Sequence, residues 1–282
     1  MNSVFAIISL LLTTAPVAMV GSPSYLNRMD SDCYEETFCI DSETKGEKVN
    51  IFVRSLVSWE ITMILDVETE NMKATGRLPL TESYKGLTKT KVVSLWIDEP
   101  NEGWAFSFSV KWIQGDFKAE HQRGFAYELP YSKGEEYLVG QGYLGNVTHQ
   151  GKYAIDWDMP IGTSVRAARA GIVVDLVEEF TEGRPDPALK TRANYVKIRH
   201  SDGTIGNYVH LAPGGVSVRI GESVSAGQVV GHSGNTGFTS GPHLHFEVYS
   251  ATRDLGRRTI PVEFNTSRRG AVQLQEGTFY SR

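Results

Sequence analysis

The sequence is short of cysteine and of basic charge, and each shortage excludes a class of protein. Two cysteines, Cys33 and Cys39, occur in 282 residues, and two cysteines alone cannot form a structural zinc site. Lysine and arginine number 28 against 33 aspartates and glutamates, so the concentrated basic face of a dedicated nucleic-acid binder is not expected. Long charged helical repeats are also lacking, which excludes a coiled coil. Apolar residues make up 40% of the chain, enough for a buried core.

The amino terminus begins with an uncharged apolar run, residues 4–20, that ends in small residues. It is short for a membrane-spanning helix, which needs about 20 apolar residues. We therefore expect residues 1–22 to be a cleaved signal peptide, with an uncleaved membrane anchor as the alternative. The expected location is the periplasm or the extracellular side of the cell envelope, with no stable membrane span after cleavage.

Export also bears on the two cysteines, which lie close together just after this leader. In an oxidising compartment Cys33 and Cys39 would close a small disulfide loop. A pair of free thiols is the alternative.

Residues 23–128 contain segments with the alternating residue pattern that is typical of short β-strands. β-Branched and aromatic residues alternate in four segments separated by polar turns: 49–57, 61–68, 91–98 and 105–113. This spacing predicts an antiparallel β-sandwich-like domain. Four of the five tryptophans of the chain lie in this domain: Trp59, Trp96, Trp104 and Trp112. They either fill the sandwich core or form a binding surface.

Residues 129–250 continue as strands but are closely punctuated by glycine, as in residues 221–241. Short alternating segments with sharp turns predict an all-β second domain rather than a βαβ arrangement. Residues 251–282 form a C-terminal extension, in which residues 259–264 are expected to be an edge strand.

The histidines supply the chemistry of this second domain. In residues 241–249, alternation places Leu244, Phe246 and Val248 on one face of a strand. The opposite face then carries His243, His245 and Glu247. Residues two apart on a strand are about 6.6–6.8 Å apart, so both imidazoles reach one cavity.

Two other segments add candidate residues. His149 and Asp156 flank a glycine-containing turn, and with one imidazole from the first strand they provide three ligands, the usual number for catalytic zinc. Asp158 shares a face with Asp156, and spacing alone does not choose between them. His210 lies on the polar face of a predicted strand.

The remaining histidines are assigned no role. His200 and His232 are interpreted as a surface turn residue and a loop residue, and His121 as a residue of the first domain without a partner.

These segments, in this order, resemble the M23 family of zinc metallopeptidases, the lysostaphin-type or LytM-type enzymes. The resemblance covers about residues 140–250 and includes His149 to Asp156, Asn207 to Leu211 and Gly241 to Phe246. It implies a compact antiparallel β-sheet fold. It also implies one zinc ion bound by His149, Asp156 and His245, and His210 and His243 as the catalytic histidines. The spacing of His149 and Asp156 is longer than is usual in that family.

The implied function is a secreted zinc metalloendopeptidase that hydrolyses the stem peptides or cross-bridges of peptidoglycan through a metal-activated water. Which of His210 and His243 is the base stays open. One alternative is a non-catalytic LytM-like regulator of a cell-wall hydrolase, and another is a secreted protease that acts on glycine-rich proteins. We expect a monomer, and residues 23–128 would position the enzyme on the wall or cover its groove.

Overall fold

The computed structural model describes residues 19–21, 29–34 and 36–282. Most of the expected signal peptide, residues 1–22, therefore lies outside the described residues. The described chain is almost entirely β-structure, as the sequence predicts, and its helical segment is the short 3₁₀ helix η1 (Pro187–Leu189). A search of the described residues finds no helix with the length and apolar character needed to cross a membrane.

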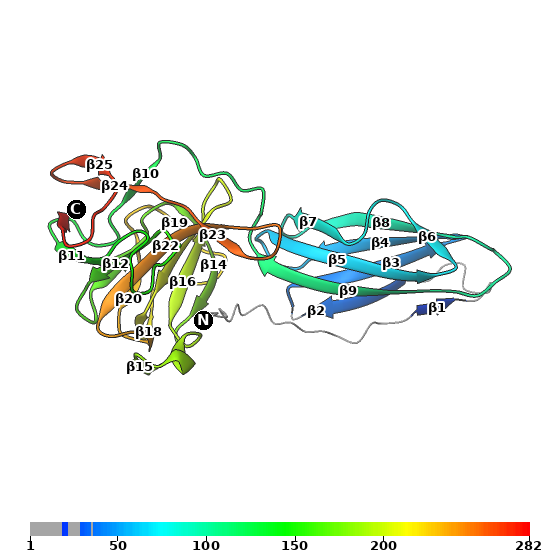
Figure 1. Cartoon of the computed structure of the whole chain (residues 1–282), viewed down its shortest axis with the longest axis horizontal. Helices are drawn as coiled ribbons and strands as arrows, with labels where there is room; N and C mark the ends of the chain where they lie inside the picture. The colour runs from blue at the N-terminus through cyan, green and yellow to red at the C-terminus, as the bar shows by residue number, and fades with distance from the viewer. Residues whose placement is uncertain (1–18, 22–28, 35) are drawn as a thin grey trace. The chain divides into compact units, whose positions relative to one another are not determined.

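The described residues fall into two compact units (Figure 1). The N-terminal unit comprises the described residues up to Lys118 together with Ala251–Gly256, and the C-terminal unit comprises Ala119–Ser250 and Arg257–Arg282. The sequence places the boundary at 128/129. Residues 119–128 group with the C-terminal unit because Tyr127 is fully buried in that unit's core.

The N-terminal unit consists of two antiparallel sheets. The four-stranded sheet has the order β1 (Met19–Gly21), β9 (Trp104–Gln114), β5 (Ile61–Glu70) and β7 (Leu80–Tyr84). The five-stranded sheet has the order β2 (Met29–Tyr34), β3 (Phe38–Lys45), β4 (Lys48–Ser55), β8 (Lys89–Ile97) and β6 (Met72–Ala74). Ile51 and Leu95 of one sheet and Met63 and Phe108 of the other share one apolar core. This arrangement confirms the predicted sandwich and its four predicted strands.

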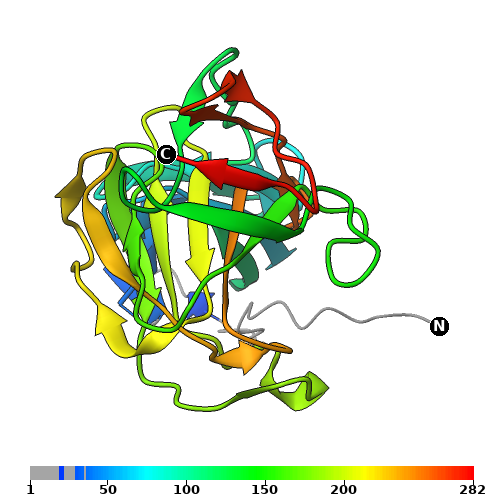
Figure 2. The same ribbon diagram turned by 90° about the vertical axis from the view of Figure 1, so that its left-hand side faces the viewer.

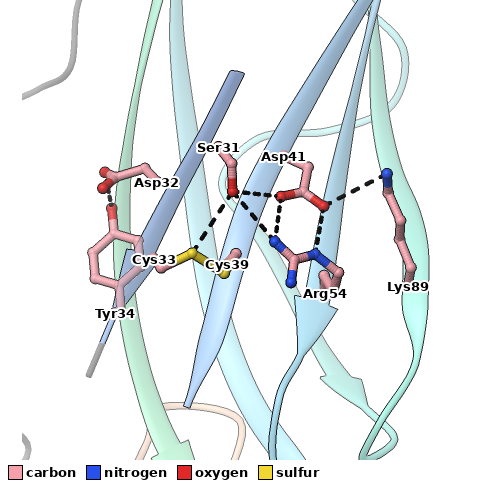
Figure 3. Close-up of a disulfide and its surroundings, with 8 residues drawn as sticks. All are labelled: Ser31, Asp32, Cys33, Tyr34, Cys39, Asp41, Arg54 and Lys89. Carbon is pink, nitrogen blue, oxygen red and sulfur yellow. Dashed lines mark hydrogen bonds and ion pairs between the residues drawn. A yellow bond between two sulfur atoms is a disulfide. The ribbon is translucent and has the colours of Figure 1, made fainter. Parts of the chain in front are cut away.

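Cys33 and Cys39 are directly opposite on β2 and β3 and form a disulfide, as predicted for an oxidising compartment (Figure 3). The tryptophans of this unit differ in burial. Trp104 belongs to the core and Trp112 packs against it, but 47% of Trp96 is exposed. Core filling therefore does not account for Trp96.

The C-terminal unit is built on a nine-stranded sheet (Figure 2). Its strands are, in order, β19 (Ser223–Val224), β14 (Gly171–Val177), β16 (Tyr195–Arg199), β17 (Ile205–Val209), β22 (His243–Ala251), β12 (Ala154–Asp158), β11 (Glu136–Gln141) and β26 (Phe279–Ser281), with β23 (Arg257–Thr259) paired to β22. Three small sheets complete the unit: β13 (Ser164–Arg166) with β20 (Val229–Ser233) and β18 (Leu211–Val216); β10 (Ala126–Glu128) with β24 (Glu263–Thr266) and β25 (Gly270–Val272); and β15 (Gly183–Arg184) with β21 (Gly237–Phe238). The pairs β10–β24 and β15–β21 are parallel, whereas neighbouring strands of the large sheet from β19 to β26 are antiparallel.

The core of the C-terminal unit contains a cluster of aromatic rings. Trp157, Phe246 and Phe264 are almost completely buried, and their rings contact one another. The strand predicted over residues 259–264 is instead two short strands, β23 and β24, separated by residues that include Pro261. A proline lacks the N–H that a continuous strand would need to donate at that point.

Three histidine interpretations are corrected by the structure. His232 lies in strand β20, directly opposite Ser164 of β13, rather than in a loop. His200 is fully buried rather than on the surface, because its ring packs against Tyr127 and its Nδ1 lies 3.1 Å from the Ala170 carbonyl oxygen. His121 belongs to the C-terminal unit, where its ring stacks on the Tyr127 ring.

Candidate metal centre

Two candidate ligands are brought together by strand pairing. Strands β12 and β22 are antiparallel neighbours, and Asp156 lies directly opposite His245 in their register. The predicted alternation of β22 is present: Leu244, Phe246 and Val248 are buried in the core. Because alternate residues of a strand point to opposite faces, His243 and His245 share the other face. The distance from His245 Nδ1 to Asp156 Oδ1 is 2.9 Å.

The third candidate ligand comes from the loop between β11 and β12. Gly151 has a positive φ of 71°, and the Lys152 N–H donates to the His149 carbonyl, so the chain turns directly after His149. This turn returns the chain to β12 and accommodates the long spacing between His149 and Asp156. The His149 ring is almost completely buried, and its Nδ1 lies 3.0 Å from the Gly142 carbonyl oxygen.

These three side chains converge. His149 Nε2 lies 3.2 Å from Asp156 Oδ2 and 3.3 Å from His245 Nδ1. One ligand atom from each residue lies within 4.8 Å of the others. Two imidazole nitrogens and one carboxylate oxygen are a donor set that suits zinc. In the part of the chain that the structure describes, Asp158 is not a member of this group, although it pairs with His243 on the same two strands.

His210 and His243 lie beside the three candidate ligands. Their ring centroids are 4.5 Å apart, and His210 is 6.1 Å from the His245 ring. The sequence places His210 within a strand, but β17 ends at Val209 and His210 has a positive φ of 65°. This left-handed backbone is uncommon for a non-glycine residue and is a form of local strain found at functional sites.

Backbone carbonyls orient three of these four imidazoles. His210 Nδ1 lies 2.6 Å from the Thr236 carbonyl oxygen, and His243 Nδ1 lies 2.8 Å from the Gly241 carbonyl oxygen. His149 Nδ1 contacts the Gly142 carbonyl in the same way. A carbonyl can only accept, so each Nδ1 carries the proton in the neutral ring and each Nε2 is left as an acceptor.

Charge is distributed unevenly within the site. Burial opposes ionisation of Asp156, but the adjacent imidazoles of His149 and His245 hold its pKa well below the usual value. Burial also acts against protonation of His245, yet Asp156 and Glu247 raise its pKa to about 9. Burial lowers the pKa of His210 to about 3, helped by repulsion from His243 and His245. The carboxylates thus attract positive charge to one side, and His210 is held neutral on the other.

Several supporting groups were not assigned by the sequence. Glu247 Oε2 lies 3.9 Å from His245 Nε2, and Asn207 Nδ2 donates to the other Glu247 oxygen at 3.3 Å. Gln141 Nε2 donates to Asp156 Oδ2 at 2.9 Å. The alternation of β22 already places Glu247 on the face of His245, so sequence could have suggested it. The backbone carbonyls that orient the imidazoles could not be predicted from sequence, because every residue has a backbone carbonyl.

Comparisons with known proteins locate this site in a family. The model of peptidase family M23 matches residues 150–256, beginning one residue after His149. A peptidoglycan DD-endopeptidase of Vibrio cholerae, ShyA, is 35% identical over 121 residues, which cover 42% of this chain and 25% of the relative. Lysostaphin of Staphylococcus simulans is 32% identical over 130 residues, which cover 46% of this chain and 24% of the relative. The chain thus spans about a quarter of the length of these two relatives.

A solved structure, the catalytic domain of the antimicrobial peptidase lysostaphin from Staphylococcus simulans, is also similar. Its sequence is 27% identical, and the match covers 44% of this chain and 87% of that one with a TM-score of 0.33. Together, the family match and the sequence relatives agree with the resemblance seen in the histidine segments. The chain therefore carries a domain of peptidase family M23 over residues 150–256.

Proposed function

We propose that this protein is a zinc metalloendopeptidase that hydrolyses peptide bonds of peptidoglycan. The observation that carries the proposal is the convergence of His149, Asp156 and His245 beside the acceptor nitrogens of two further imidazoles. The three would hold one zinc ion. A bound zinc ion supplies Lewis acidity, which polarises a carbonyl and acidifies a water molecule.

The chain's own residues account for the proton transfers. His210 and His243 both present a bare Nε2, so either can accept a proton from the attacking water. The ring that accepts this proton becomes a donor. It can then stabilise the oxyanion by a hydrogen bond and return the proton to the leaving amine as the C–N bond breaks.

The substrate class follows from the relatives, which include a peptidoglycan DD-endopeptidase. The Cys33–Cys39 disulfide supports a location outside the cytoplasm, where such bonds persist. All five site residues come from one chain, so the site is complete in a monomer.

The proposal is tested by incubating the purified full chain with cell-wall sacculi and, side by side, with a glycine-rich protein. We expect soluble muropeptides whose masses identify the bond cleaved, loss of activity with a chelator, and recovery on adding zinc. Cleavage of the glycine-rich protein alone would identify a secreted protease instead. No cleavage of either substrate by zinc-loaded protein would favour a regulatory module.

A further inference from the structure

The two outer faces of the N-terminal sandwich differ in charge. Strand register places six cations and two carboxylates on the outer face of the five-stranded sheet. We call this surface the basic face; its charged residues are Asp41, Glu43, Lys45, Lys48, Arg54, Lys73, Lys89 and Lys91. The outer face of the four-stranded sheet carries three carboxylates, Asp66, Glu68 and Glu70, and one cation, Lys111. The protein as a whole is acidic, so the basic face is a local feature that its composition does not predict.

The two carboxylates of the basic face are already paired. Asp41 contacts Arg54 at 2.9 Å and Lys89 at 3.5 Å (Figure 3). Glu43 contacts Lys89 at 2.9 Å. Asp41 is largely buried under these cations, which hold its pKa below the usual value. Among the described residues, no carboxylate forms an ion pair with Lys45, Lys48 or Lys91.

One row of the basic face combines cations with the exposed tryptophan. Register places Lys45, Lys48, Trp96 and Lys73 side by side on β3, β4, β8 and β6. Lys48 Nζ lies 4.6 Å from the Trp96 ring centroid, and Lys73 pairs with Asp98 just beyond β8. Like charges directly opposite on neighbouring strands destabilise a sheet, so the Lys45–Lys48 pair is not explained by folding.

An exposed aromatic ring among lysines fits a particular kind of partner. Sugar rings present C–H groups that pack on an aromatic face, and lysine ammonium groups attract carboxylates. We propose that the basic face binds peptidoglycan, with Trp96 packing on a sugar ring of the glycan strand and Lys45, Lys48 and Lys91 contacting free carboxylates of the stem peptides. This inference rests on the proposed function for its choice of polymer, but binding is measured without hydrolysis.

The test is co-sedimentation of the full-length holoenzyme with purified sacculi on ice, across a range of salt concentrations. Trp96→Ala should weaken binding about tenfold, as expected for an exposed aromatic anchor. Lys48→Glu should weaken binding by about threefold or more and flatten its salt dependence. Lys111→Glu makes the same charge change on the opposite outer face and should leave binding within about twofold of the parent.

Two further measurements decide the chemistry. Sacculi whose carboxylates have been amidated should bind the parent as weakly as untreated sacculi bind Lys48→Glu. On a small soluble peptide, Trp96→Ala should keep the parental kcat/KM. Equal losses for Lys48→Glu and Lys111→Glu, or full binding to amidated sacculi, would overturn the proposal. If the parent binds sacculi but cleaves nothing, the proposed hydrolysis fails while the binding surface stands.

Discussion

The two units of this chain are both antiparallel β-structure, yet they bury different polar groups. Among the described residues of the N-terminal unit, the buried polar ones are serine and threonine together with Asp41. The C-terminal unit buries His149, Asp156, His200 and Glu247 as well. Burying imidazole and carboxylate groups costs free energy unless they are paired, so their concentration in one unit indicates where chemistry takes place. The N-terminal unit instead carries Lys45, Lys48 and Lys91 on an outer face.

The largest effect that would test this contrast comes from the two aspartates of β12. Asp156→Ala should abolish metal binding and hydrolysis, because it removes one of the three ligands. The matched variant Asp158→Ala should retain near-stoichiometric zinc. Metal analysis of both purified proteins makes the comparison, and zinc loss in Asp158→Ala alone would reverse the assignment.

A smaller but still large effect is expected at His210. His210→Ala should keep zinc and fold but lose about 10²–10⁴-fold in hydrolysis of sacculi, the usual contribution of general acid–base catalysis. Metal content and thermal unfolding serve as the controls. Hydrolysis at the parental rate would remove His210 from the mechanism.

The buried His200 predicts a pH effect on stability in the C-terminal unit. Burial lowers its folded pKa to about 4, below the ordinary value of 6.5. Between these values the unfolded chain binds a proton that the folded chain does not, so the free energy of unfolding falls as pH falls from 6.5 to about 4. Over this whole pH range, the shifted pKa of His200 lowers the free energy of unfolding by on the order of 3 kcal/mol.

His200→Gln tests this pH effect, because glutamine does not titrate but its amide can still donate a hydrogen bond to the Ala170 carbonyl. Denaturant unfolding at several pH values should show a shallower acid-side loss of stability in the variant. Parallel pH profiles for the two proteins would show that His200 does not titrate in this way.

Glu247 should act on the metal through His245. If His245 binds metal through Nδ1, its Nε2 carries a proton that faces Glu247. Glu247→Gln should therefore weaken metal affinity about 10–100-fold, the usual effect of losing such an outer carboxylate. Competition with a chromogenic chelator measures the affinity. An unchanged affinity would show that Glu247 only fills space beside Asn207.

The smallest effect on function is expected from the disulfide, which lies in the N-terminal unit. Replacing Cys33 and Cys39 by serine should lower the stability of that unit by about 2 kcal/mol, as expected for a short loop. Hydrolysis of a small soluble peptide should not change. Loss of that activity would show that the two units are more closely coupled than their separate cores indicate.

Strand alternation made much of the site predictable. The placement of His243 and His245 on one face, and of Leu244 and Phe246 on the other, follows directly from the period of a strand. Alternation within a strand does not predict which distant strands pair with each other. The position of Asp156 opposite His245 therefore could not be predicted from alternation alone. The interpretation of His200 failed for a related reason: a turn-like sequence gives no information about the aromatic ring of Tyr127 that packs on it. The backbone conformation of His210 also depends on its surroundings rather than on its neighbours in sequence.

The register between β12 and β22 has a consequence for how such sites can diversify. Two of the three candidate ligands are held by main-chain pairing, so their separation is insensitive to changes elsewhere in the chain. The third candidate ligand, His149, lies on a loop, and this loop only has to place the His149 ring beside Asp156 and His245. Loops tolerate insertions at small entropic cost, so lineages can lengthen or shorten this one, and reshape what borders the metal, without rebuilding the centre.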